Sequence, residues 1–199
     1  MTPANKGQKL PAEPLTPDEV KLLIRACSNR AASGIRNRAL IVVLYRAGLR
    51  ISEALAIYPK DLDADAGTIR VLRGKGKTAR TVGLDAGAWA ILQLWLDRRA
   101  ALGTTGRQPV FCTLKGQPMK TSYVRSLFNR LGKKSGLAKR THPHGLRHTF
   151  AFELASEKTP IHLIQQQLGH RHLSTTDCYI RHLNPVAVVE AMKARSWSL

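Results

Sequence analysis

The stretch "GTIRVLRGKGKTARTVGL", from Gly67 to Leu84, decides the fold class of this 199-residue chain. Two β-rich segments, "GTIRVLR" and "ARTVGL", flank the glycine-bearing turn "GKGKT", and this arrangement is typical of a β-hairpin. Most of the remaining chain has helical patterning instead. The sequence therefore predicts a mainly α protein with a small antiparallel β-sheet, an α+β fold, and its 43% hydrophobic residues can fill one core.

Helices are predicted on both sides of the hairpin. The segment "TPDEVKLLIRAC" begins with Thr16 as the N-cap, Pro17 at the first helical position and Glu19 three residues after the cap, which is a capping box. A core helix in "IRNRALIVVLYRAG" ends at Gly48 and is followed by a short helical piece, "SEALAIY". After the hairpin, Asp85 is the predicted N-cap of a long amphipathic helix.

The second half of the chain reads as further helices. One strand is expected at "PVFCTL", residues 109–114, before a basic helix in "SYVRSLFNRLGKKSG". Short helices are then predicted in "HGLRHTFAFELAS", "PIHLIQQQLG", "STTDCYIRH" and "PVAVVEAMKARS".

The charge of the chain points to a polyanionic partner. There are 32 Lys and Arg residues against 13 Asp and Glu, which gives a net charge of +19 at pH 7. Between Asp97 and Glu153 lie 12 basic residues and no acidic one. Such a run repels itself unless it meets phosphates, so we favour nucleic acid over a merely solvated basic surface. Phosphate contacts are predicted from Lys77, Arg80, Lys120, Arg125, Lys133, Lys134, Lys139 and Arg140.

Several other classes of protein and site are disfavoured. No apolar span of about 18 residues is present that could cross a membrane. Three cysteines without a CxxC pair argue against a disulfide framework and a thiolate zinc site, and fit a reducing compartment. His144 and His148 are four residues apart, but "HGLRH" lacks the glutamate of an HExxH zinc motif. We therefore expect no metal and no cofactor.

The lysines of "GKGKT" do not form a nucleotide-binding P-loop, because that motif needs a glycine at position 71, where this chain has Val71. Lys75 and Lys77 instead lie at the tip of the predicted hairpin. There they are either solvated or able to reach a DNA groove or a phosphate.

A phosphate-binding set is suggested by two arginines and nearby histidines. Arg147 follows His144 by three residues, which places both on one helical face. Together with Arg50 they supply planar and imidazole donors suited to a phosphate with developing charge. Tyr179, nine residues after His170, is either an ordinary residue at a helix edge or a nucleophile that receives a phosphate.

Taken in order, "AGLRISEAL", the "GKGK" hairpin, "HPHGLRH", "LGH" and the tyrosine of "TTDCYIRH" resemble the catalytic domain of the tyrosine recombinases, the phage-integrase-type site-specific recombinases. The resemblance implies that fold and a set of catalytic residues: Arg50, Lys75, His144, Arg147, His170 and Tyr179. It also implies that Glu53, in "RISE", positions Arg50.

The resemblance implies a reaction as well. Tyr179 attacks a DNA phosphodiester to form a 3′-phosphotyrosyl bond, and Lys75 protonates the departing 5′-oxygen, with Lys77 as the alternative donor. His144 accepts the tyrosine proton or contacts the phosphate, and His170 is another phosphate donor. The task is integration, excision, inversion or resolution. A type IB topoisomerase and a DNA-binding protein that does not cut are the alternatives.

For domain organisation we expect a tail or linker stub at residues 1–15 and a catalytic domain at 16–199. A C-terminal helix at about 184–195 docks either on a neighbouring protomer or on its own domain. Fifteen residues are too few for the N-terminal core-binding domain of most members, so this chain is a naturally small member or a catalytic fragment. The expected partners are double-stranded DNA and further copies of the chain in a synaptic tetramer, formed from free monomers. We expect a bacterial or phage-encoded protein that is cytoplasmic and associated with the nucleoid.

Overall fold

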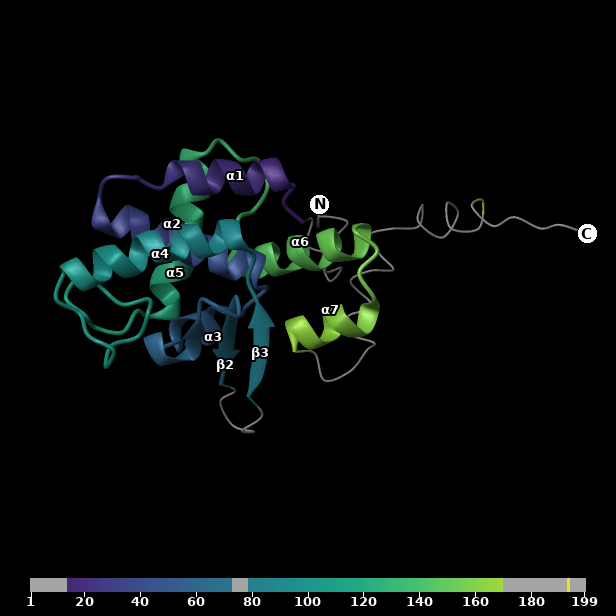
Figure 1. Cartoon of the computed structure of the whole chain (residues 1–199). Coiled ribbons are helices and arrows are strands. Elements are labelled where there is room, and N and C mark those ends of the chain that lie inside the picture. The colour runs from purple at the N-terminus through teal and green to yellow at the C-terminus, as the bar shows by residue number, and fades with distance from the viewer. Residues whose placement is uncertain (1–13, 73–78, 170–192, 194–199) are drawn as a thin grey trace, which may run out of the picture.

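The computed structural model describes residues 14–72, 79–169 and 193. The first two ranges form one mainly helical body with a small sheet at one end (Figure 1). The helices are α1 (Pro17–Ala26), α2 (Ala32–Arg46), α3 (Ile51–Leu55), the 3-10 helix η1 (Pro59–Asp61), α4 (Ala86–Ala101), α5 (Thr121–Lys134), α6 (Pro143–Ser156) and α7 (Ile161–Leu168). The strands are β1 (Leu62–Asp63), β2 (Thr68–Val71) and β3 (Arg80–Gly83). The predicted α+β class is confirmed.

The sheet has three antiparallel strands in the order β1-β2-β3. Strands β2 and β3 pair Ile69 with Val82 and Val71 with Arg80, which confirms the predicted hairpin. The tip with Lys75 and Lys77 lies outside the described residues. Strand β1 was not predicted, because two residues are too short to carry a strand pattern.

The prediction of a strand at residues 109–114 is wrong. Here Cys112 makes a single bridge to Pro118, and the N–H of Val110 donates to the oxygen of Ile57 at 2.7 Å. Val110, Phe111 and Cys112 are all buried. The segment is therefore an apolar loop built into the core, and a short apolar run cannot be told from a buried strand by its pattern alone.

Helix α2 is the centre of the core. Residues 39–45 are all buried, and the helix packs chiefly against α4 and then against α6. Trp95 of α4 is fully buried, and its indole N–H donates to the oxygen of Val110 at 2.8 Å. None of the helices among the described residues is long and apolar enough to span a membrane.

Helices α1 and α4 begin at the N-caps that the sequence predicts. At α1 the N–H of Thr16 donates to Glu19 Oε2 at 2.7 Å and the N–H of Glu19 donates to Thr16 Oγ1 at 3.2 Å, which confirms the capping box. At α4 the N–H of Ala88 donates to Asp85 Oδ1 at 3.0 Å, as expected for the N-cap. The predicted helices at 174–182 and 185–196 lie outside the described residues, apart from Lys193.

The turn between α2 and α3 requires the glycine that ends the second predicted helix. Gly48 has φ +62°, a left-handed conformation that disfavours side chains. A Cβ added at this position would lie 2.6 Å from Phe150 Cδ1 and 2.8 Å from Leu168 Cδ2. The close approach brings the turn that precedes α3 against Phe150 of α6 and Leu168 of α7.

Candidate active site

Three of the six predicted catalytic residues lie in the described chain, and the structure brings them together. Arg50 is the residue just before α3, while His144 and Arg147 lie in the first turns of α6. Arg147 is 3% exposed and donates from Nη1 to the oxygen of Gly48 at 2.6 Å and from Nη2 to that of Leu168 at 2.7 Å. It therefore joins the turn before Arg50 to the end of α7.

His144 lies in a field of positive charge. Partial burial of the ring, and then the charges of Arg147, His142 and Arg50, lower the pKa of His144. Its ring meets that of His148 edge-on, with the centroids 4.4 Å apart. An imidazole with a lowered pKa is neutral at pH 7, which is the form that can accept a proton.

Glu53 is the electrostatic centre of the site. It is 9% exposed, its Oε2 accepts the N–H of Arg50 at 2.9 Å, and its Oε1 accepts Arg50 Nη1 at 2.9 Å. Burial acts to raise the pKa of Glu53, but the hydrogen bonds and charges of Arg80 and Arg50 outweigh it and lower the pKa to about 2. This placement is what the predicted supporting role of Glu53 requires.

The structure places Arg80, one of the predicted phosphate contacts, against the carboxylate of Glu53. Its side chain is only 10% exposed and donates from Nη1 and Nη2 to the two carboxylate oxygens of Glu53, both at 2.9 Å. Its Nε donates to the oxygen of Gln167 at 3.3 Å. Arg80 is therefore a nearly buried ion-pair partner of Glu53, held by the two parallel hydrogen bonds of a bidentate pair.

A groove opens beside these residues. A cavity of about 250 Å³ and a neighbouring one of about 430 Å³ share Ile51, Arg125 and His144. Arg50 and Thr121 line the smaller cavity, and Arg140 and His142 line the larger. Two predicted phosphate contacts, Arg125 and Arg140, thus lie next to the candidate catalytic residues.

Some of the other predicted phosphate contacts lie away from this groove. Lys134 Nζ donates to the oxygen of Ala26 at 2.8 Å, and Lys139 Nζ pairs with Glu19 Oε2 at 3.1 Å. Both therefore lie against α1. Helix α5 spans about 20 Å, and Lys120 and Lys133 lie exposed towards its opposite ends. The basic run between Asp97 and Glu153 therefore does not form one patch, because Arg125 and Arg140 line the groove whereas Lys134 and Lys139 lie against α1.

His142 is a site residue that sequence reasoning left aside. It is the N-cap of α6, and its Nδ1 accepts the N–H of Gly145 at 3.0 Å. Burial, and then the charge of Arg140, lowers the pKa of His142. The proline that follows it is typical of a first helical position and was the available signal for a cap.

Lys75, Lys77, His170 and Tyr179 lie outside the described residues. The described chain reaches Arg80 on one side and Gly169 on the other, and β3 contacts α7 (Figure 1). In residues 14–72 and 79–169, no group of three or more His, Cys, Asp or Glu side chains is placed to hold a metal ion.

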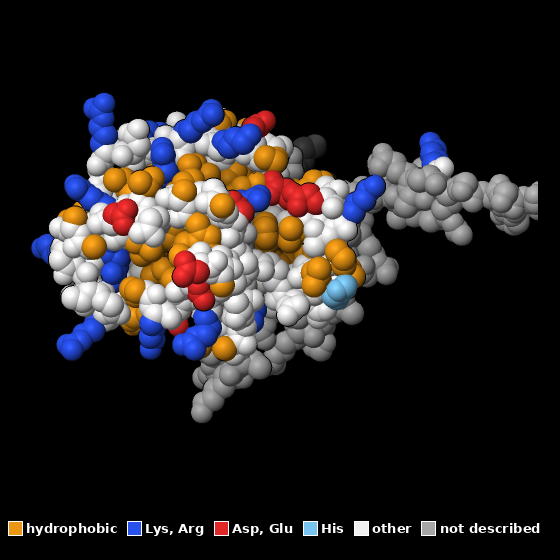
Figure 2. Space-filling view, viewed as in Figure 1, with side chains coloured by type: hydrophobic (Ala, Val, Ile, Leu, Met, Phe, Trp, Pro, Cys, Tyr) orange, Lys and Arg blue, Asp and Glu red, His pale blue; other side chains and the backbone are white. Residues whose placement is uncertain are grey.

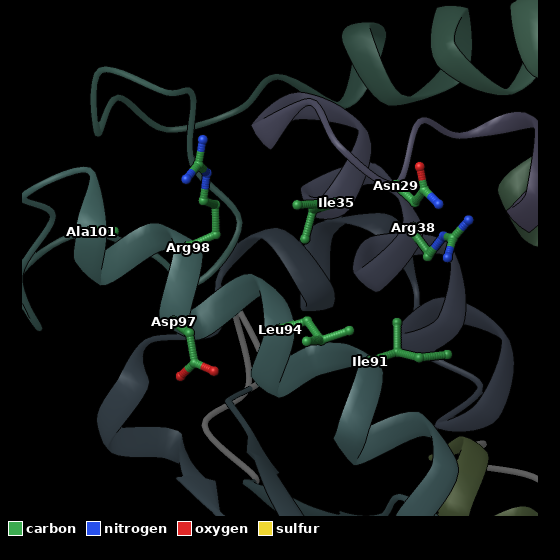
Figure 3. Close-up of a pocket in the computed structure, with 8 residues that line it drawn as sticks. All are labelled: Asn29, Ile35, Arg38, Ile91, Leu94, Asp97, Arg98 and Ala101. Carbon is green, nitrogen blue, oxygen red and sulfur yellow. The ribbon is translucent and has the colours of Figure 1, made fainter.

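Another hollow of about 400 Å³ lies between α2 and α4 and contains none of the predicted catalytic residues (Figure 3). Ile35, Ile91 and Leu94 line its apolar part, and Arg38 and Arg98 lie on either side of them. Figure 2 shows hydrophobic side chains gathered at the centre of this face and basic ones around its edge. Its chemistry does not resemble a phosphate site, so the groove beside Arg50 is the better candidate.

Comparison with known proteins agrees with this geometry. The model of the phage integrase family matches residues 13–185. Tyrosine recombinase XerC of Xylella fastidiosa (strain M23) is 38% identical over 146 residues, 73% of this chain and 48% of that protein. Tyrosine recombinase XerD of Ralstonia nicotianae (strain ATCC BAA-1114 / GMI1000) is 34% identical over 167 residues, 83% of this chain and 54% of that protein. The chain thus spans about half the length of these curated relatives.

Solved structures show the same fold. The crystal structure of XerA recombinase has a TM-score of 0.81 and 32% identity, over 96% of this chain and 68% of that one. XerH site-specific recombinase, bound to palindromic difH substrate in a post-cleavage complex, has a TM-score of 0.76 and 29% identity, over 92% of this chain and 53% of that one. The predicted catalytic-domain fold is confirmed.

Proposed function

Because this chain belongs to the phage integrase family, we propose that it breaks and rejoins double-stranded DNA at specific sites as a tyrosine recombinase. The observation that carries the proposal is the meeting of Arg50, His144 and Arg147 beside one groove. Arg50 lies nearly a hundred residues before His144 and Arg147 in the sequence, and folding brings the three together. A DNA phosphate bound in the groove explains why the positively charged side chains gather beside one buried carboxylate, that of Glu53.

In the proposed reaction, Tyr179 Oη bonds to phosphorus and the 5′-oxygen leaves. His144, neutral at pH 7, takes the phenol proton, and Lys75 gives a proton to the leaving oxygen. Arg50, Arg147 and His170 stabilise the charge on the non-bridging oxygens. Such donors are typically worth on the order of a hundred- to a thousandfold in rate each. The bond energy is kept in the phosphotyrosine, so a 5′-hydroxyl can reverse the step without ATP, a metal or a cofactor.

Glu53 and Arg80 support this site without reacting. The Glu53 carboxylate holds the Arg50 backbone and guanidinium, while Arg80 supplies the second positive charge that keeps the carboxylate ionised. Arg50 remains 44% exposed, so its guanidinium can still reach a ligand in the groove.

The proposed partners are double-stranded DNA and further copies of the chain in a synaptic tetramer, assembled at the bacterial nucleoid from monomers. Arg125 and Arg140 are the described residues best placed to contact the backbone near the cleaved bond. The helix proposed at about 184–195 docks on a neighbouring protomer.

A covalent-trapping experiment tests the proposal. Genomic DNA trapped on the protein is sequenced to find the site, and that site is then built into a duplex nicked near the scissile phosphate. The wild-type chain should form an adduct that resists SDS, and Tyr179→Phe should not. Tyr58→Phe, which changes a tyrosine that does not line the groove, is the matched control.

The outcomes separate the alternatives. If the wild-type chain forms no adduct, the remaining alternative is a DNA-binding protein that does not cut DNA. Adduct formation on any sequence, with relaxation of supercoiled plasmid and no exchange between two copies of the site, would favour the topoisomerase reaction. The relatives named above are recombinases, which favours site-specific exchange.

A further inference from the structure

A second hollow lies beside the groove, on a neighbouring face of helix α5. Thr121 and Arg125 line the groove. Ser122 and Ser126, each one position further along, line the hollow, which has a volume of about 650 Å³. Residues four apart share one helical face, and these two faces lie about 100° apart around the helix. No acidic residue of the described chain lines this space, which we call the α5 hollow.

Arg36 supplies a buried positive charge to the α5 hollow. Its side chain lines the hollow and is 4% exposed. Nη1 donates to the oxygen of Cys112 at 3.1 Å, and Nη2 donates to Tyr123 Oη at 2.9 Å. Nε and Nη2 also donate to Asn37 Oδ1, at 3.2 and 3.0 Å. All these acceptors are neutral, so no carboxylate of the described chain balances the charge, and a nearby anion would stabilise it.

Tyr123 carries the effect of this charge to the surface. Its hydroxyl accepts Arg36 Nη2, so the O–H itself can donate to another acceptor. Within the described chain no hydrogen bond uses this O–H as the donor. The guanidinium lies 5.4 Å from the centre of the tyrosine ring, and Tyr123 is 37% exposed. A hydroxyl that accepts a hydrogen bond from a cation is a stronger donor, which suits an anionic acceptor.

Arg99 shows that a buried arginine alone does not make such a site. It is 5% exposed and donates to the backbone oxygens of Thr105, Gln108 and Pro109. Backbone oxygens cannot donate onward, so Arg99 only holds a loop. Arg36 differs because one of its acceptors has a hydrogen of its own to give.

We propose that the α5 hollow binds a second phosphate of the DNA backbone, away from the cleaved bond, through the hydroxyl of Tyr123 and the ammonium of Lys120. Arg36 polarises the hydroxyl from behind. The inference rests on the proposed function. Lys120 is exposed and lines the hollow, and Leu114 and Met119 give it an apolar wall for a deoxyribose.

DNA is the ligand because the α5 hollow continues the groove. One strand carries a phosphate about every 3.4 Å along the helix axis, whereas an α-helix with its side chains is about 10 Å wide. A strand bound beside Arg50 and crossing the first turn of α5 therefore presents a further phosphate on the other side of that turn.

The test is a scan of single phosphates in the duplex that carries the trapped site. Each phosphate is replaced in turn by a neutral methylphosphonate, and the affinity is measured by fluorescence anisotropy. Tyr123→Phe keeps the ring over Arg36 and removes only the hydroxyl. It should weaken binding of the natural duplex by about tenfold. At one phosphate away from the cleaved bond, methylphosphonate should weaken the wild type but cause no further loss in Tyr123→Phe.

Two further measurements separate the residues of the site. Lys120→Ala should lose the methylphosphonate effect at the same phosphate and reduce the slope of log K against log salt by about 1. Tyr123→Phe removes no charge and should keep the slope. At saturating DNA its rate of adduct formation should stay within about twofold of wild type, because the contact is equal in ground and transition states.

Tyr58→Phe is the matched control, since it removes the same hydroxyl from a tyrosine that lines neither the groove nor the α5 hollow. It should leave the affinity and every step of the scan unchanged.

An unchanged affinity of Tyr123→Phe would overturn the inference, as would a methylphosphonate effect that persists at every phosphate in this variant. A slower adduct formation at saturating DNA would also overturn it. Each of these outcomes leaves wild-type adduct formation intact, and so leaves the proposed function standing. Failure of the wild-type chain to form an adduct would refute the proposed function itself, and this inference with it.

Discussion

Arg147 on helix α6 donates to the backbone oxygen of Gly48 at 2.6 Å. The arginine thereby fixes the left-handed turn that places Arg50, two residues later, at the mouth of the groove. The same guanidinium holds the oxygen of Leu168, next to the last described residue before His170. The site is therefore assembled by one buried side chain that ties three elements together.

The turn at Gly48 predicts a specific cost for a side chain. Gly48→Ala should lower the free energy of unfolding by about 2–6 kcal/mol, because a left-handed backbone and overpacking each cost about 1–3 kcal/mol. Gly103→Ala is the control: φ is +76° there, but an added Cβ meets nothing within 4 Å. Urea unfolding measures the difference. Equal losses for the two variants would contradict the close approach of Phe150 and Leu168.

Glu53 predicts a pH dependence of stability. Its folded-state pKa of about 2 lies below the ordinary value of 4.5, so its contribution is complete above pH 4.5 and is lost as the pH falls towards 2. The contribution is on the order of 3 kcal/mol. The unfolding free energy of the wild type should fall more between pH 6 and pH 3 than that of Glu53→Gln, measured by urea unfolding at each pH.

At pH 7 the Glu53→Gln variant should itself be less stable than the wild type. It leaves the nearly buried Arg80 without its ion-pair partner, and breaking one side of a buried pair costs roughly 3–5 kcal/mol. Parallel pH curves for the two proteins would show that Glu53 is not held ionised by Arg80 and Arg50.

The two arginines that line the groove and the lysine that lies against α1 should differ in their contribution to DNA binding. Arg125→Ala and Arg140→Ala should each weaken binding at all sequences and reduce the slope of log K against log salt by about 1, because each removes one phosphate contact. Lys134→Ala is the control, since Lys134 is bound to the oxygen of Ala26 away from the groove. Fluorescence anisotropy across a salt series measures the slopes. A matching change for Lys134→Ala would place DNA along the whole helix.

The lowered pKa of His144 predicts how the rate of adduct formation changes at acidic pH. Its pKa is lowered, so the ring stays neutral below the ordinary value of 6.5 and loses its accepting form only at more acidic pH. Adduct formation should therefore be independent of this group at pH 7 and fall below pH 6.5. His144→Gln should remove that fall as well as slow the reaction, whereas His162→Gln, at an exposed position on α7, should change neither. A fall that begins above pH 6.5 would assign the proton acceptor elsewhere.

Local chemistry explains which features were predictable. The capping box of Thr16 and Glu19, the Asp85 cap and the pairing of β2 with β3 each depend on residues close together in sequence. The order of Arg50, His144 and Arg147 likewise pointed to one phosphate site. The loop at residues 109–114 could not be predicted, because its apolar run satisfies the core whether or not it forms a strand.

The α+β class, the basic character of the chain and the ordered residues that resemble a recombinase site can be read from the sequence, because periodicity, caps and composition are local or additive properties. The long-range partners of those residues become visible only in the folded chain. There Arg80, an expected DNA contact, pairs with Glu53, and Lys134 and Lys139 lie against α1. The role of a charged or polar side chain depends on which partner lies close enough to pair with it, and that partner is determined by the fold.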